Sequence, residues 1–218
     1  MKMPIASAVA AIMAVALGGG LARGDEPPTK VEPDSVLYPR WQSANASLTP
    51  ALEVFLARDA RRGFVSFARD GRRWTSPIFT MWKATVADVN GDGEDELVLG
   101  MWSRARRHDE SSPHRTVWVM AWADDRLVPL WRGSALSLPL VDFQLADVDG
   151  DGTFELLAIE SAGERCRWAL YRWNGFGFWV DAQTALSCEA HLSSRSHCVM
   201  ELGKERCATH VDGHWMLQ

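Results

Sequence analysis

The most constraining feature of the sequence is an acidic segment that occurs twice. Residues 85–99 (TVADVNGDGEDELVL) and residues 144–158 (QLADVDGDGTFELLA) align without a gap, at an offset of 59 residues (147 minus 88). Apolar residues flank the acidic stretch on both sides in each copy, which is typical of a loop between two strands. The duplication indicates a repeated supersecondary unit that buries its apolar face against its neighbours.

Hairpin patterns also repeat along the chain, each with two short apolar runs around a two-residue turn. The turns fall at 70–71, 124–125, 174–175 and 212–213. The full unit therefore reads strand, acidic loop, strand, linker, strand, tight turn, strand, and it is complete at 84–133 and 143–182. Degenerate units precede and follow these two. We expect an all-β fold, a β-propeller-like array of about four four-stranded antiparallel blades, with the ring either complete or incomplete.

The spacing of oxygen-bearing side chains in the acidic segments is typical of a Ca2+ loop. In the first copy, oxygens at positions 1, 3 and 5 are followed by glycine at 6 and a carboxylate at 9: Asp88, Asn90, Asp92, Gly93 and Glu96. Alternate residues of a tight loop point toward one centre, and position 7 offers a carbonyl. This number of hard oxygen donors suits Ca2+, whereas Zn2+ prefers His or Cys. The loops are not EF-hands, because the twelfth position holds Leu99 or Ala158 instead of Glu.

The two loops resemble the Ca2+-binding loops of FG-GAP/VCBS repeats, which occur in integrin-type β-propellers. The shared pattern is D-x-[ND]-x-D-G-x-x-[DE], followed by an apolar strand. The resemblance implies two Ca2+ ions, each bracing the turn between the first two strands of a blade. It implies one ligand set of Asp88, Asn90, Asp92 and Glu96 with the Glu94 carbonyl, and another of Asp147, Asp149, Asp151 and Glu155 with the Thr153 carbonyl. The alternative is a pair of solvated acidic turns without metal.

The spacing of the two loops also predicts how they are arranged. An offset close to one blade places them at equivalent positions in adjacent blades, displaced by on the order of 10 Å or more. We therefore expect two separate sites that act independently, without a carboxylate that bridges two metal ions.

The N-terminal residues predict export. Lys2, an apolar run over 5–17 and small residues at 22–24 are typical of a signal peptide, and the run is shorter than the ~20 residues of a membrane span. We expect a signal peptide at 1–24, a flexible leader at 25–40 and the repeat domain at 41–218. The chain would then be periplasmic or secreted, with no membrane span after cleavage. The net charge of -5, without a dominant basic patch, argues against nucleic acid as a partner.

Four cysteines lie in the last third of the chain: Cys166, Cys188, Cys198 and Cys207. An even number in an exported chain favours disulfides. Three pairings are open, and we favour Cys166–Cys188 with Cys198–Cys207, because each pair would bracket a predicted hairpin. The alternative is a Zn2+ site built from two Cys-x-x-His pairs, which end at His191 and His210.

The sequence favours a binding or scaffold module, in which Ca2+ is structural and the partner is a protein or a glycan. It contains no Gly-x-Ser-x-Gly, His-Glu-x-x-His or P-loop motif. Its eleven tryptophans fit core packing better than a sugar platform. The competing hypotheses are a glycan-acting hydrolase and an accessory subunit of an envelope complex.

Overall fold

The computed structural model divides the chain into residues 1–31 and residues 32–218. It describes residues 33–38, 51–57, 61–69, 72–103, 113–123, 126–133, 136–195, 197–211 and 214–218. The predicted signal peptide and the turns at 70–71, 124–125 and 212–213 lie outside these ranges. Within them, no helix has the length and hydropathy that crossing a membrane would require.

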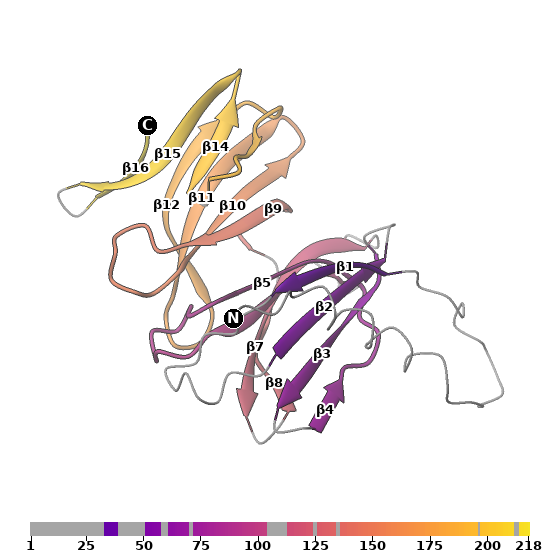
Figure 1. Cartoon of the computed structure of the whole chain (residues 1–218). Helices are drawn as coiled ribbons and strands as arrows, with labels where there is room; N and C mark the ends of the chain where they lie inside the picture. The colour runs from indigo at the N-terminus through magenta and orange to yellow at the C-terminus, as the bar shows by residue number, and fades with distance from the viewer. Residues whose placement is uncertain are drawn as a thin grey trace, which may run out of the picture. The chain divides into compact units, whose positions relative to one another are not determined.

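The described part of the chain is all-β and forms four antiparallel sheets of four strands each, with the strands in chain order (Figure 1). Sheet 1 contains β1 (Pro33–Tyr38), β2 (Ala51–Ala57), β3 (Gly63–Arg69) and β4 (Arg72–Thr75). Sheet 2 contains β5 (Met81–Ala87), β6 (Glu96–Ser103), β7 (His114–Ala123) and β8 (Arg126–Arg132). Sheet 3 contains β9 (Leu140–Ala146), β10 (Glu155–Ala162), β11 (Arg165–Trp173) and β12 (Phe178–Leu186). Sheet 4 contains β13 (His191–Leu192), β14 (Cys198–Glu201), β15 (Lys204–Val211) and β16 (His214–Leu217). The predicted four-stranded antiparallel unit is confirmed.

One predicted boundary needs correction. Pro33–Tyr38, which the sequence placed in a flexible leader, forms strand β1 and pairs along its whole length with β2. Proline is tolerated as the first residue of a strand, where its missing N–H costs little, and Pro33 holds that position. The folded unit therefore begins at residue 32, before the predicted domain start at 41.

The turn between β11 and β12 also differs from the prediction. The strands end at Trp173 and begin again at Phe178, so the connection has four residues instead of the two expected at 174–175. The Asn174 Oδ1 atom accepts hydrogen bonds from the amides of Phe176 and Gly177, both at 3.0 Å. These side-chain bonds stabilise a wider turn than the Asn-Gly pair alone indicates. In the other three hairpins, the strand registers leave two residues for each turn.

Consecutive sheets bury a core between them. In strand β6, Leu97 and Leu99 lie in the hydrophobic cluster shared with sheet 1, whereas Val98 lies in the cluster shared with sheet 3. In β10, Leu156 and Leu157 divide in the same way between the clusters facing sheets 2 and 4. Side chains of a strand alternate between faces, so a sheet covered on both sides needs a continuous apolar run.

The tryptophans contribute mainly to these cores, as the sequence predicted. Trp168 is fully buried, and Trp82, Trp131 and Trp173 are half-buried against the cluster between sheets 2 and 3. Trp179 is different, because 67% of it is exposed on β12.

The favoured disulfide pairing is confirmed. Cys166 is bonded to Cys188, and Cys198 to Cys207, which lies directly opposite it on the neighbouring strand. His197 brings a ring nitrogen to within 4.8 Å of the second pair. Disulfide sulfurs are not the thiolates that Zn2+ requires, so the structure does not support the alternative zinc site.

Candidate metal centres in two equivalent acidic loops

The two acidic segments occupy the same place in their sheets. The first acidic loop, residues 88–95, joins β5 to β6, and the second acidic loop, residues 147–154, joins β9 to β10. Each loop closes on an equivalent antiparallel pair, Ala87 opposite Glu96 and Ala146 opposite Glu155. The structure therefore places every predicted ligand in a loop, or at its end, between the first two strands of a sheet.

The glycines explain why this sequence pattern forms these loops. The φ angles are 77° at Gly91 and 86° at Gly93, and they are 78° and 91° at Gly150 and Gly152. Positive φ is the left-handed region that glycine adopts without the steric cost of a Cβ atom. The two loops thus share one backbone conformation, set by the same G-D-G spacing.

The first aspartate of each loop ties the loop to itself. The Asp88 carboxylate accepts the amide of Gly91 at 2.7 Å and that of Gly93 at 2.8 Å. The Asp147 carboxylate accepts the amides of Gly150 at 2.7 Å and Gly152 at 3.1 Å. These bonds turn the backbone around the carboxylate, which keeps its oxygens on the inside of the loop.

The third and fifth positions repeat this arrangement. Asn90 Oδ1 accepts the amide of Asp92, and Asp92 Oδ1 accepts the amide of Glu94, each at 2.8 Å. In the second loop, Asp149 Oδ1 accepts the amide of Asp151 at 3.3 Å, and Asp151 Oδ1 accepts that of Thr153 at 2.8 Å. Successive side-chain oxygens are therefore held on one side of each loop by local hydrogen bonds.

The last acid of each loop is buried. Glu96 and Glu155 are only 1% and 2% exposed, and each accepts one backbone amide at 3.0 Å, from Val89 and Val148 respectively. Burial, and to a smaller extent the charges of Asp92 and Asp88, raise the pKa of Glu96 to about 8, although the hydrogen bond from the Val89 amide acts to lower it. Burial likewise raises the pKa of Glu155 to about 7. A cation beside either carboxylate would favour its ionised form.

The two loops differ in what lies between their acids. In the first loop, Asn90 Nδ2 donates to Asp92 Oδ2 at 2.9 Å and to Glu96 Oε1 at 2.8 Å. In the second loop, one oxygen each from Asp147, Asp149 and Glu155 lies within 4.8 Å of the others. The Asn90 amide therefore bridges two acids in the first loop, whereas three carboxylates converge in the second loop.

The donor oxygens are of the kind that Ca2+ prefers in both loops, but within the described residues three acids converge only in the second loop. Oxygens that bind one Ca2+ at about 2.3–2.6 Å are at most about 5 Å apart, and the three acids of the second loop meet this limit. In the first loop, half a turn of the Asn90 amide would present its oxygen to Asp92 and Glu96, but it would break the bond which that oxygen accepts from the Asp92 amide. Asp151, a predicted ligand, lies outside the converging group of the second loop.

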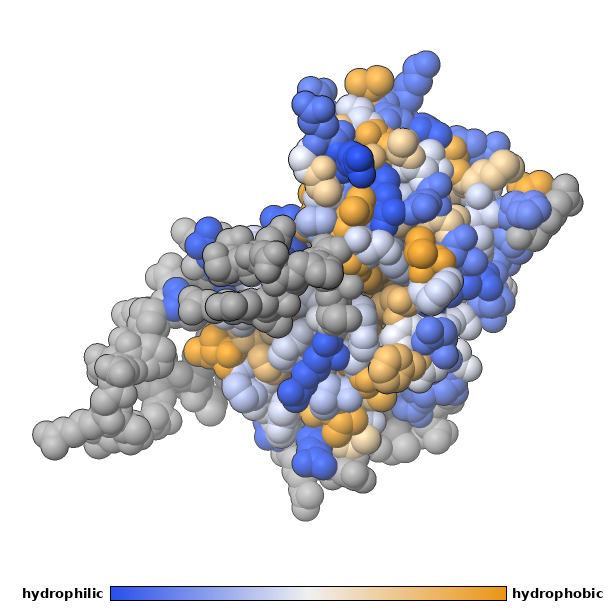
Figure 2. Space-filling view, turned by 180° about the vertical axis from the view of Figure 1, so that it is seen from behind, coloured by the Kyte–Doolittle hydropathy of each residue, from blue (hydrophilic) through white to orange (hydrophobic). Residues whose placement is uncertain are grey.

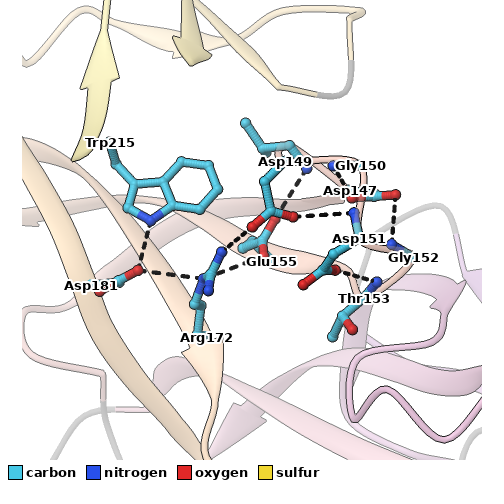
Figure 3. A network of polar contacts seen from close by, with 11 residues as sticks. Asp147, Asp149, Gly150, Asp151, Gly152, Thr153, Glu155, Arg172, Asp181 and Trp215 are labelled. Atoms are coloured by element: carbon cyan, nitrogen blue, oxygen red, sulfur yellow. Dashed lines mark hydrogen bonds and ion pairs between the residues drawn. The ribbon is translucent and has the colours of Figure 1, made fainter. Parts of the chain in front are cut away.

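Arg172 lies beside the second acidic loop (Figure 3). The sequence alone did not indicate a role for this residue. Arg172 of β11 donates from Nη2 to Asp149 Oδ2, and its Nε lies 3.5 Å from Glu155 Oε1 and 3.4 Å from Asp181 Oδ2. Its guanidinium carbon lies 4.9 Å from the centre of the Trp215 ring, whose Nε1 donates to Asp181 at 2.6 Å. Strands β12 and β16 therefore contribute to the surroundings of this loop.

The two loops also contact each other. The amide of Phe154 donates to the carbonyl of Asp88 at 2.7 Å. A Cβ atom added to Gly91 would lie 3.0 Å from Thr153 Oγ1. The loops lie at equivalent positions in consecutive sheets, as expected, but this contact removes the reason to treat them as independent. The absence of a bridging carboxylate stays a prediction.

A third buried acid, Glu160, belongs to the fold. Glu160 is fully buried, and its carboxylate accepts the Tyr171 hydroxyl at 2.8 Å, the Arg167 Nε at 2.7 Å and the Leu138 amide at 3.1 Å. Burial raises the pKa of Tyr171 and keeps it a hydrogen-bond donor at neutral pH. These partners satisfy the carboxylate within the protein, which indicates a structural role.

Comparison with protein-family models finds no match for this chain, and comparison with curated proteins finds none either.

Proposed function

We propose that this chain is an exported calcium-binding β-repeat protein that acts as a binding or scaffold module, with one structural Ca2+ in each acidic loop. The observation that carries the proposal is that the side chains of the first, third and fifth residues accept the same backbone amides in both loops. Each loop also ends in a buried glutamate, which is a costly group to bury without a counter-charge. A single acidic turn is common in proteins without a metal ion. The same loop conformation at equivalent places in two sheets favours a shared role for the two loops.

The proposed architecture is a propeller-like array in which each sheet is a blade. Lys83 and Asp142 support it: their positions differ by 59 (142 minus 83), and Lys83 Nζ lies 2.7 Å from Asp142 Oδ1. Equivalent positions on the first strands of sheets 2 and 3 are therefore neighbours. A near-constant rotation between repeats produces this relation, and it brings the two acidic loops to the same edge of the array.

A structural role for Ca2+ follows from what the loop residues already do. The carboxylates of Asp88 and Asp147 bind their own loop amides, so they shape the turn as well as offering oxygens. When bound, Ca2+ would supply the positive charge that balances three or four clustered acids. At a concentration of a hundred times the dissociation constant, each site would then stabilise the fold by about 2.7 kcal/mol.

The surface offers a candidate contact for a partner at the turn between β11 and β12. Phe176 is 83% exposed in that turn and Trp179 is 67% exposed on β12. Large exposed aromatic residues are enriched at protein and glycan interfaces. On the coloured part of the face in Figure 2, hydrophobic residues occur in separate groups among hydrophilic ones. Because both aromatic side chains are exposed, we favour the Phe176–Trp179 region as the binding surface.

Export to the periplasm or beyond is part of the proposal. The two disulfides support it, because disulfides persist in oxidising compartments and are rare in the cytosol. The signal-peptide pattern in the sequence points the same way.

Thermal unfolding with added Ca2+, with Mg2+ and with EDTA tests the proposal. We expect Ca2+ to raise the melting temperature over EDTA, with a smaller effect of Mg2+, because the loops offer more oxygens than an octahedral ion uses. Asp88→Ala and Asp147→Ala should each reduce the Ca2+ effect. A melting temperature that is the same in all three solutions would reject structural calcium.

A further inference from the structure

The cross-strand neighbour of the last acid distinguishes the two loops. In sheet 3, Leu156 pairs with Tyr171, so extending the register by one residue places Arg172 opposite Glu155. In sheet 2, Leu97 pairs with Met120, so the same step places Ala121 opposite Glu96. The equivalent of Arg172 is therefore a residue without charge.

Arg172 is directed at the groups that the proposed metal would use. It contacts Asp149 and Glu155, two of the three acids whose oxygens converge in the second loop. Its Nε atom is buried and makes no hydrogen bond within the described residues, although it lies near Glu155 and Asp181. Apart from the hydrogen bond from Nη2 to Asp149, the guanidinium is held at this loop by charge, so another cation is able to replace it.

We propose that Arg172 is a built-in cation that competes with Ca2+ for the second acidic loop, so that this loop binds Ca2+ more weakly than the first. The inference rests on the calcium sites proposed above and adds a specificity-determining residue to one of them. Arg172 also lies over the Trp215 ring and beside Asp181, which Trp215 binds. Loading the second loop therefore frees Arg172 from two acids and changes the contact between β11 and strand β16 of sheet 4.

The two loops are measured separately by calorimetry in the full chain. An Asp88→Ala background reports the second loop, and an Asp147→Ala background reports the first. We expect the second loop to bind Ca2+ at least about 5-fold more weakly, the lower end of usual coupling between sites. Arg172→Met keeps an apolar stem over Trp215 and removes the charge, so it should tighten the second loop by a similar factor. Arg172→Lys keeps the charge and should leave that loop weak.

Arg165→Met is the matched control, because it removes the same charge from the same strand. Arg165 lies seven residues from Arg172 (172 minus 165), which along a strand is roughly 20 Å. We expect it to change neither loop, and Arg172→Met to leave the first loop unchanged. A second readout is the 15N resonance of Arg172 Nε, which should shift as Ca2+ fills the second loop.

Three outcomes overturn the inference. Equal affinities at the two loops, an Arg172→Met variant with unchanged affinity at the second loop, or an equal effect of Arg165→Met would each do so while leaving the calcium sites in place. If neither the wild-type chain nor Arg172→Met binds Ca2+ at either loop, the proposed function itself fails. If the second loop binds Ca2+ only after Arg172→Met, competition by Arg172 is supported, but the proposal of a structural Ca2+ in the second loop of the wild-type chain fails.

Discussion

Replacing Glu96 with glutamine should have opposite effects on stability with and without Ca2+. Glu96 is 1% exposed, and burial raises its pKa from 4.5 to about 8 in the folded protein. Because the folded pKa is the higher one, the stabilising contribution of the protonated form is complete below about pH 4.5. It is lost as the pH rises through 8. The metal-free protein at pH 8 therefore carries the cost of a buried, ionised carboxylate.

The size of this cost follows from the two pKa values. A shift from 4.5 to about 8 corresponds to at most about 5 kcal/mol at about 1.4 kcal/mol per unit, and to slightly less at pH 8, where half of the carboxyl groups stay protonated. Glutamine removes the charge but accepts with only one oxygen, so the loss of one bond, from Val89 or Asn90, costs about 1 kcal/mol. In EDTA at pH 8 we expect Glu96→Gln to stabilise the chain by about 2–3 kcal/mol, or about 5–10 °C in melting temperature.

Saturating Ca2+ should reverse the sign. At a thousandfold excess over the dissociation constant, the wild-type chain gains about 4.1 kcal/mol from Ca2+ in the first loop, which exceeds the gain of about 2–3 kcal/mol that glutamine gives in EDTA, and Glu96→Gln does not receive this binding energy. Chemical denaturation at pH 5 and pH 8, with Ca2+ and with EDTA, measures all four values. Glu155→Gln is the comparison variant and should gain less in EDTA, because its folded pKa is only about 7 and Arg172 is its neighbour. Destabilisation by Glu96→Gln in EDTA at pH 8 would refute the argument.

Three further results are expected. Because the loops share a main-chain hydrogen bond, a double-mutant cycle of Asp88→Ala and Asp147→Ala on Ca2+-dependent stability should show coupling above about 0.5 kcal/mol, and strict additivity would contradict this. Removing the Cys166–Cys188 disulfide, which spans 22 residues, should cost about 3 kcal/mol of unfolding free energy, and thiol labelling of the denatured, unreduced chain should find no free cysteine. Glu160→Met should destabilise the chain by about 3–5 kcal/mol in urea denaturation, because it leaves the half-buried Arg167 without its carboxylate and the Tyr171 hydroxyl and Leu138 amide without their acceptor, and a loss below about 1 kcal/mol would contradict that role.

The parts of the fold that the sequence predicted are those set by local chemistry. The loop conformation follows from glycines at positive φ after aspartates, and these residues stand at fixed spacing in both copies. The repeated sheet follows from apolar runs of strand length separated by turn residues. Cys198 and Cys207 flank one short hairpin, so even their pairing could be read from the sequence.

The parts that sequence reasoning missed depend on register and on competing turn chemistry. Arg172 reaches the second loop because β10 and β11 pair in one particular register, which the two-residue turn between Ala162 and Arg165 sets; the apolar pattern fixes only which side chains share a face. Glu160 lies in an apolar run and is buried only because residues from β11 and from the segment before β9 supply its hydrogen bonds. The side chain of Asn174 widened a turn for which the dipeptide alone predicted two residues.

Calorimetric titration of the EDTA-treated chain with Ca2+ tests the central claim most directly. We predict a stoichiometry of two for the wild type, one for each of Asp88→Ala and Asp147→Ala, and none for the double variant. Each carboxylate lies in a different loop, and each is the first residue of its pattern. A stoichiometry of zero or one at millimolar Ca2+ in the wild type, or two sites that survive both substitutions, would contradict the account.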